Sequence, residues 1–179
     1  VENTEEYGLI NDRMYEIYGQ IEKFIPTCNN VFIIEDDIEI PENTYQKLSS
    51  ALEMYPELGT VTGVAMNRRL KNDIHYNLPI LWDIVESNYV HVEKRTAKAT
   101  IHEECKGFGL QQIGSSHTGC WMTRSSIVKK LGLGKQTPEI QFFDQAWGYR
   151  LYKAGWKIAV DWSVKCKHYS MINNKKVYV

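Results

Sequence analysis

Apolar residues in the N-terminal third of the chain are spaced as two helices on either side of a short strand. They recur every three or four positions over residues 9–25, which predicts an amphipathic helix ended by Pro26. Residues 31–34 (VFII) form a continuous apolar run, typical of a strand buried on both faces in a parallel sheet. After Pro41, a second helix that ends at residues 56–59 is predicted from an apolar stripe: Tyr45, Leu48, Leu52 and Tyr55.

The later part of the chain continues this alternation of strands and helices. Three further segments have strand-like patterns: residues 60–65, 119–123 and 157–161. Between the last two strands we expect a short helix over residues 125–131 and a longer one, with Gly155 in the left-handed conformation at its end. The apolar face of that longer helix contains Phe143, Trp147 and Leu151. Strands that alternate with helices predict one α/β domain over residues 1–179.

Residues 66–112 follow neither the helical nor the strand period. We expect a long, partly irregular excursion there, with a helix near residues 78–87 and a strand near residues 89–92. A long irregular segment within a compact domain is usually functional or mobile. The polar tail over residues 173–179 is expected to fray.

Charge, hydropathy and cysteine spacing limit the classes of protein to which this chain can belong. The chain has 21 Lys or Arg and 22 Asp or Glu, and a net charge of −1 gives no reason to expect nucleic-acid binding. No run approaches the roughly 20 apolar residues of a membrane helix, and the N-terminus lacks a signal-peptide pattern. The four cysteines are far apart and form no CxxC pair. We therefore expect free buried thiols in a cytoplasmic protein, with no transmembrane segment.

Three consecutive carboxylates, Glu35, Asp36 and Asp37, directly follow the apolar strand. In open α/β sheets, ligands bind at the carboxyl ends of strands. Three adjacent negative charges repel one another unless a cation neutralises them, and oxygen ligands suit Mg²⁺ or Mn²⁺. A solvated acidic turn would explain the triplet equally well, so both interpretations stay open at this point.

Two other polar residues have simple structural explanations when each is considered alone. Asp144 lies in the first turn of a predicted helix, where the helix dipole stabilises a carboxylate. His168 follows the last predicted strand, and a single histidine is more often a hydrogen-bonded structural residue than a metal ligand. Their order and spacing relative to the carboxylate triplet favour a functional role for both residues.

In combination, these segments resemble the inverting glycosyltransferases of family 2, which have the GT-A fold. Residues 34–41 (IEDDIEIP) resemble the family's DxD motif at a strand end, followed by Pro. Residues 119–124 (GCWMTR) are similar to its small-residue strand on the acceptor side. Residues 143–158 (FDQAWGYRLYKAGWKI) resemble a family pattern of Asp, Arg-Leu and a Gly-Trp pair that enters a strand. His168 falls where the family often has a metal-binding His, so the resemblance covers about residues 31–170.

The resemblance implies a GT-A-like (Rossmann-like) fold with a mixed, mostly parallel sheet flanked by helices. Only one predicted helix precedes the DxD-like strand, so we expect the N-terminal nucleotide-binding strands to be missing. The start at Val1 rather than Met favours a part of a longer domain. A sheet without its first strands would expose an edge, through which self-association is expected. The excursion over residues 66–112 would lie near the acceptor site.

Position by position, the resemblance implies a hexosyltransferase-type enzyme that transfers a sugar from a nucleotide-diphosphate sugar to an acceptor hydroxyl with inversion. Asp37, together with Glu35 and His168, would bind Mn²⁺ or Mg²⁺ at the donor's two phosphates. Asp36 would contact the donor. Asp144 would be the general base that removes the proton of the acceptor hydroxyl. The glycan or other acceptor would contact His117, Thr118, Gly119 and Trp121.

Two positions depart from the family pattern. Glu35 replaces the first Asp of the DxD motif, and Phe143 replaces the usual Glu before the catalytic Asp, which removes a possible acceptor contact. Trp121 could equally be a core residue, and Arg150 could pair with a site carboxylate or lie on a solvated helix face. Two other functions remain open: a catalytically incomplete GT-A-like binding or interaction domain, and a metal-dependent phosphoryl-transfer or hydrolytic enzyme.

Overall fold

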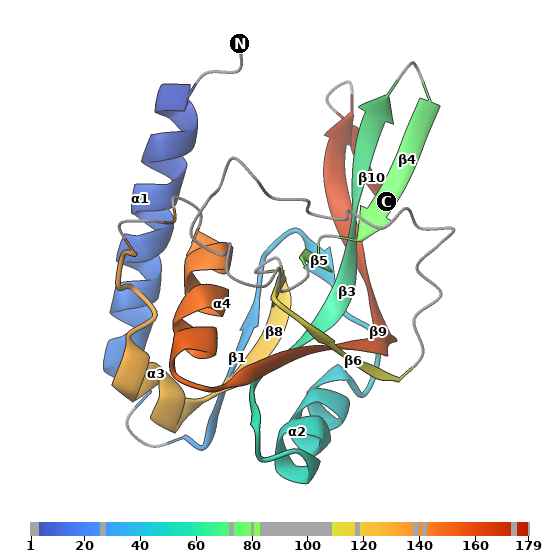
Figure 1. Ribbon diagram of the computed structural model, residues 1–179. Coiled ribbons are helices and arrows are strands. Elements are labelled where there is room, and N and C mark those ends of the chain that lie inside the picture. The colour runs from blue at the N-terminus through green and yellow to red at the C-terminus, as the bar shows by residue number, and fades with distance from the viewer. Residues whose placement is uncertain are drawn as a thin grey trace.

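The chain forms an α/β structure in which helices cover both faces of a mixed sheet (Figure 1). The computed structural model describes residues 4–25, 28–71, 74–79, 81–82, 109–116, 119–137, 140, 143–172 and 175–178. Its helices are α1 (Thr4–Ile21), the 3₁₀ helix η1 (Glu22–Phe24), α2 (Thr44–Met54), α3 (Ser125–Leu131) and α4 (Phe143–Lys153). Helices α1, α3 and α4 pack on one face of the sheet and α2 on the other.

In the part of the chain that the structure describes, the main sheet has eight strands, with β1-β8-β3-β9-β10 as its central order. Strand β4 pairs with β3, while β2 and β6 pair with β9. The eight strands are β1 (Asn30–Ile34), β2 (Ile38–Glu39), β3 (Leu58–Lys71), β4 (Ile74–Pro79), β6 (Leu110–Ile113), β8 (Cys120–Arg124), β9 (Lys157–Ile172) and β10 (Lys175–Tyr178). A separate small sheet joins β5 (Leu81–Trp82) to β7 (Ser115–Ser116).

The prediction of a mixed sheet is confirmed, but the prediction that it is mostly parallel is wrong. Among the described strands only β3 and β9 pair in parallel. Strand β1 pairs antiparallel with β8, with Ile34 opposite Cys120, and β8 in turn pairs antiparallel with β3. Among the described strands, β8 is the single neighbour of β1, so the other side of β1 is an edge of the sheet. The predicted self-association through such an edge stays a prediction.

Two separate cores explain why β1 has a continuous apolar sequence. Val31 and Ile33 belong to the core beneath α1 and α4, whereas Phe32 packs against the core beneath α2 and lies 6.0 Å from the ring of Tyr45. Both faces of the strand are therefore covered. A continuous apolar run indicates that both faces of a strand are covered, but it does not indicate the direction of the neighbouring strands. Parallel pairing was predicted because strands in parallel sheets are usually covered on both faces.

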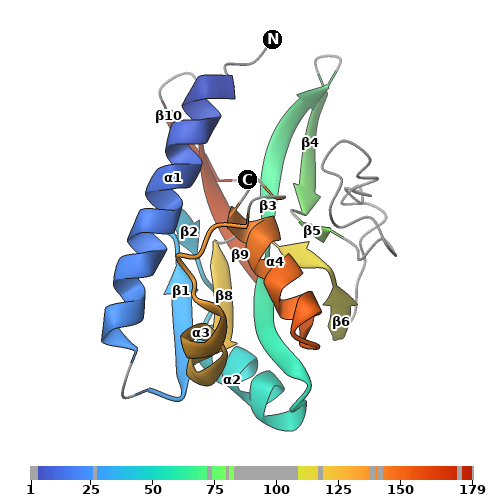
Figure 2. The ribbon, with the colours of Figure 1, turned by 60° about the vertical axis from the view of Figure 1, so that its left-hand side comes forward.

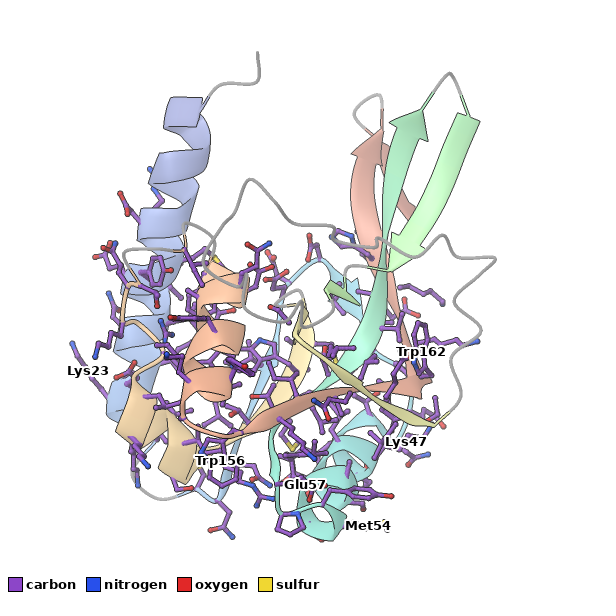
Figure 3. All side chains as sticks on the ribbon, in the orientation of Figure 1. Lys23, Lys47, Met54, Glu57, Trp156 and Trp162 are labelled. Atoms are coloured by element: carbon purple, nitrogen blue, oxygen red, sulfur yellow. The ribbon has the colours of Figure 1, made fainter. Side chains whose placement is uncertain are left out.

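The core under α2 is mainly aliphatic and includes fully buried Leu48 and Leu52. Of the four residues in the predicted stripe of this helix, Tyr45 and Tyr55 are exposed instead. Figure 3 shows Lys47 on the side of α2 that lies next to β9, and its Nζ donates to the carbonyl of Ser163 at 3.1 Å. This contact and the buried leucines fix α2 beneath the sheet.

Most elements predicted from apolar spacing are present. The structure confirms the first helix, the helices α2, α3 and α4, and the strands β1, β3, β8 and β9. Gly155 has a positive φ of 81° at the end of α4, as predicted. The helix predicted near residues 78–87 is wrong where the structure describes it, because these residues belong to β4 and β5. The strand near residues 89–92 falls outside the described residues, and the tail pairs with β9 as β10 instead of fraying.

The cysteine prediction is confirmed for two of the four residues. Cys120 and Cys166 are free and buried in the core under α2. Cys28 is free but exposed, and Cys105 lies outside the described residues. A hydrogen bond with Cys120 and burial both raise the pKa of Cys166. In the part of the chain that the structure describes, no helix is long and apolar enough to cross a membrane.

Candidate functional site

The carboxylate triplet forms the turn between β1 and β2. The N–H of Glu35 donates to the carbonyl of Gly119 at 3.0 Å, which ties the start of the turn to the beginning of β8. The N–H of Tyr169 on β9 donates to the carbonyl of Asp37 at 2.8 Å, and β2 then pairs with β9. Main-chain hydrogen bonds from two different strands therefore hold the turn in place.

This arrangement brings Asp37 against His168. The Nε2 atom of His168 lies 3.0 Å from Oδ2 of Asp37, and the His168 side chain is 19% exposed. Although the Asp37 side chain is 42% exposed as a whole, its other oxygen, Oδ1, is shielded from solvent and has no hydrogen-bond partner among the residues that the structure describes. A shielded carboxylate oxygen without a partner is costly, and in many proteins a bound ion or water satisfies such an atom.

The other two carboxylates of the triplet are placed differently. Asp36 is exposed, and Glu35 is partly buried. Within the described ranges, no group of three or more His, Cys, Asp or Glu side chains is arranged to hold a metal ion, so Glu35 does not join Asp37 and His168 in such a cluster.

Asp144 lies in the first turn of α4. Its Oδ1 accepts a hydrogen bond of 2.7 Å from the N–H of Gln145, and its main-chain carbonyl accepts one of 2.8 Å from Oγ of Ser115. Ser115 lies on β7, four positions before Gly119, the residue that precedes β8. The amino end of α4 and the carboxyl end of β1 lie at the same end of the sheet in both views (Figures 1 and 2).

Phe143, which stands where the family pattern has Glu, is part of the core. Its ring stacks on Tyr18 at 4.0 Å between centroids and meets the edge of Tyr15 at 5.4 Å. A glutamate at this position would be buried among aromatic rings without a partner, which explains the apolar residue. The departure therefore reflects packing between α1 and α4.

Trp121 is also a core residue and not part of an accessible acceptor surface. It is 2% exposed and lies between Tyr18, at 6.2 Å, and Trp147, at 5.9 Å. Of the two interpretations left open for this residue, the structure supports the core. Gly119 is buried and accepts the hydrogen bond from the turn, while residues 117–118 (His117 and Thr118) lie outside the described residues.

Arg150 forms no ion pair with a site carboxylate among the described residues, and it is partly buried instead of lying on a solvated helix face. Its guanidinium donates to the carbonyls of Leu133 and Lys135 and to Oγ1 of Thr137. It also lies 5.4 Å from the ring centre of Trp147. Burial lowers the pKa of Arg150 to about 10. The residue therefore anchors the loop after α3 to α4.

Ser115 is the site residue that sequence reasoning missed. It is 2% exposed, and its hydroxyl holds the main chain at Asp144. Ser115 lies between the irregular segment (residues 66–112) and the strand predicted over residues 119–123, and a lone serine there gives no signal of its own. Only the docking of α4 against β7 reveals the contact.

Comparisons with known proteins identify no family. No family model matches the chain, and no curated protein matches it. Among solved structures, 18 chains match. One is the crystal structure of A197 from STIV, with 8% sequence identity, a TM-score of 0.48, and an alignment that covers 96% of this chain and 74% of that chain.

Proposed function

We propose that this chain is the catalytic, metal-binding part of a GT-A-like inverting glycosyltransferase. The proposed reaction transfers a sugar from a nucleotide-diphosphate sugar to an acceptor hydroxyl. The observation that carries the proposal is the Asp37–His168 contact of 3.0 Å, beside a shielded Asp37 oxygen that has no partner in the described part of the chain. Asp144, the second carboxylate that such chemistry needs, lies at the same end of the sheet.

Asp37 and His168 are the proposed protein ligands of Mn²⁺ or Mg²⁺. The Oδ1 atom of Asp37, to which no described residue donates a hydrogen bond, is a hard oxygen ligand of the kind these cations prefer. With only two protein ligands, most of the coordination positions are left to water and to the phosphate oxygens of the donor. A bound cation would act as a Lewis acid and offset the charge of the departing diphosphate. Asp36, which is exposed beside Asp37, is the proposed contact to the donor's hydroxyls.

Asp144 is the proposed general base. The helix dipole at the amino end of α4 favours its ionised form, and the N–H of Gln145 orients the carboxylate at 2.7 Å. The carboxylate would accept the proton of the acceptor hydroxyl while that oxygen attacks the anomeric carbon from the face opposite the diphosphate. A single displacement of this kind inverts the anomeric configuration.

Calorimetry with a panel of nucleoside diphosphates, with and without Mn²⁺, tests this proposal. We expect exothermic binding of at least one nucleoside diphosphate that requires Mn²⁺ and is reversed by a chelator. No heat with any of them would favour the catalytically incomplete binding domain. Metal-dependent binding followed by release of phosphate, with no transfer of sugar, would favour the phosphoryl-transfer or hydrolytic enzyme.

A further inference from the structure

Strand β1 (Asn30–Ile34) is the first strand in the order of the main sheet. Among the described strands it pairs with β8 alone, and Figure 2 shows β1 at the margin of the sheet, followed by β8 and β3. The cores beneath α1 and α2 cover the two faces of β1. The described elements therefore leave one side of the strand open, the edge between these two helices.

The hydrogen bonds to β8 define which backbone groups of β1 face this open edge. The N–H of Glu35 donates to the carbonyl of Gly119, and the N–H of Ser125 donates to the carbonyl of Asn29. Both pairs continue the register of the β1–β8 ladder. Hydrogen-bonded positions alternate along an antiparallel strand, so the odd-numbered residues of β1 are bonded to β8. The N–H and carbonyl groups of the even-numbered residues point toward the open edge: Asn30, Phe32 and Ile34.

This edge lacks the charged and proline residues that protect many edge strands from pairing. The sequence of β1, Asn-Val-Phe-Ile-Ile, contains neither. Ile34 is apolar but 42% exposed, and Tyr45 of the neighbouring α2 is 54% exposed, with its ring 6.0 Å from that of Phe32. An uncharged edge strand with exposed apolar side chains beside it is a template for a further strand.

We propose that two copies of this chain pair antiparallel through β1 and form one continuous sheet across a two-fold axis. Phe32 lies opposite its own counterpart at the axis, and Asn30 of each copy lies opposite Ile34 of the other. In this register each outward N–H meets an outward carbonyl of the other copy, which gives three hydrogen bonds from each copy and six in all. The edge is therefore complementary to itself, and the self-association predicted from the sequence gains a strand, a direction and a register.

The charges next to β1 favour antiparallel pairing of two copies. In the proposed register, Glu35 and Asp36 of one copy lie beside Asn29 and Cys28 of the other, which are uncharged or neutral side chains. The two acidic triplets are then at opposite ends of the paired strands. Parallel pairing of the same residues would place the triplets side by side, where like charges repel one another.

The number of hydrogen bonds indicates the size of the interface and hence its strength. Interfaces contain about one hydrogen bond per 100–200 Å², so six correspond to about 600–1,200 Å² of buried surface. Weak and transient complexes have interfaces of this size. We therefore expect an equilibrium between one and two chains in the micromolar to millimolar range of protein concentration. This inference does not depend on the proposed enzymatic function.

Sedimentation velocity over this concentration range tests the dimer. Ile34→Pro removes an N–H that points to the open edge and leaves the bonds to β8 intact, because strands tolerate proline where the N–H faces outward. The dimer loses two of its six hydrogen bonds, so its dissociation constant should rise by at least about 25-fold. Ile34→Thr is the matched control, since it keeps the N–H and a β-branched side chain, and its effect should be much smaller. An equal effect of both replacements, or a mass of one chain up to millimolar protein, would overturn the proposal.

Disulfide cross-linking tests the register. In a background of Cys28→Ser and Cys105→Ser, Asn30→Cys and Ile34→Cys are made as separate variants. Opposite residues of the proposed pair have Cα atoms about 5.5 Å apart, which suits a disulfide, whereas each position lies more than about 13 Å from its own counterpart. An added oxidant should therefore cross-link a mixture of the two variants and neither variant alone. Cross-linking of Ile34→Cys with itself would indicate parallel pairing and overturn the proposal, as would the absence of a cross-link in the mixture.

Discussion

The two carboxylates proposed for chemistry, Asp37 and Asp144, are held in opposite ways. Asp37 follows the end of a strand and contacts a side chain from β9 through one oxygen, while its other oxygen is shielded and has no partner within the described ranges. Asp144 starts a helix, where its carboxylate is bound by the next backbone N–H and its carbonyl by Ser115. The surroundings of Asp37 are thus incomplete, whereas two main-chain contacts fix Asp144.

This difference predicts that changes near Asp37 affect ligand binding and that changes near Asp144 affect the rate of turnover. A carboxylate with an unused, shielded oxygen gains from a ligand, so changes near Asp37 should alter the affinity for metal and donor. A carboxylate fixed by its own helix needs no ligand to orient it, so changes near Asp144 should alter the rate and leave the affinity unchanged. The following variants test this separation, in order of decreasing expected effect.

Asp144→Asn should have the largest effect, on the rate alone. The amide keeps the shape of the side chain and can still accept the hydrogen bond from Gln145, but it cannot take up a proton at neutral pH. We expect kcat for sugar transfer to fall by about 10²–10⁴-fold. Metal-dependent affinity for the nucleoside diphosphate, measured by calorimetry, should stay the same. Normal transfer by this variant would show that another residue is the base.

Asp37→Asn should mainly reduce binding. It removes the charge of a proposed metal ligand, so the Mn²⁺-dependent affinity for the nucleoside diphosphate should fall by more than the roughly 10–100-fold that the loss of an outer-shell partner costs. Glu42→Gln is the matched control, because this exposed residue lies five positions away and its replacement removes the same charge. Unchanged affinity in Asp37→Asn, or an equal loss in the control, would contradict the assignment.

His168→Gln should have a smaller effect on the same property. A glutamine side chain can still hydrogen-bond to Asp37 but replaces a good nitrogen ligand with a weak one. We expect the Mn²⁺ concentration required for half-maximal donor binding to rise by about tenfold. Calorimetry at a series of Mn²⁺ concentrations measures this shift. If the requirement for metal is unchanged, His168 only positions Asp37.

The elements that could be predicted from the sequence are those fixed by local spacing. Helix α4 follows from the spacing of Phe143, Trp147 and Leu151, all of which are buried. The direction of pairing could not be predicted, because β8 lies between β1 and β3 although it comes much later in the chain. The helix predicted near residues 78–87 failed for a related reason: pairing with the distant end of β3 gives residues 74–79 their strand conformation.

In the candidate site, too, some features could be predicted from spacing in the sequence, whereas others depend on contacts between distant parts of the chain. The family spacing placed Asp37 and His168 in one site, and the structure brings them within 3.0 Å, although their roles as metal ligands stay predictions. The role of Trp121 could not be decided from the sequence, because an aromatic residue on a strand suits a sugar platform as well as a core. Its burial depends on Tyr18 from α1, more than 100 positions away. No local pattern contains that information.

Ser115→Ala should have the smallest effect, and it tests whether the main chain at Asp144 must be held. Its hydroxyl forms a hydrogen bond of 2.8 Å to the carbonyl of Asp144, and such a bond contributes about 1 kcal/mol. Loss of this contact lets the first turn of α4 move, so we expect kcat to fall by about fivefold while donor affinity is unchanged.

Thr123→Val provides a matched comparison for Ser115→Ala. Oγ1 of Thr123, which is buried like Ser115, donates to the carbonyl of Gly59 at 2.9 Å near the other end of the strands. Both variants should lower the free energy of unfolding by about 1 kcal/mol in chemical denaturation. Only Ser115→Ala should lower kcat. Equal losses of kcat in the two variants would mean that Ser115 acts through overall stability. The hydrogen bond from Ser115 would then not be what holds Asp144 in position for catalysis.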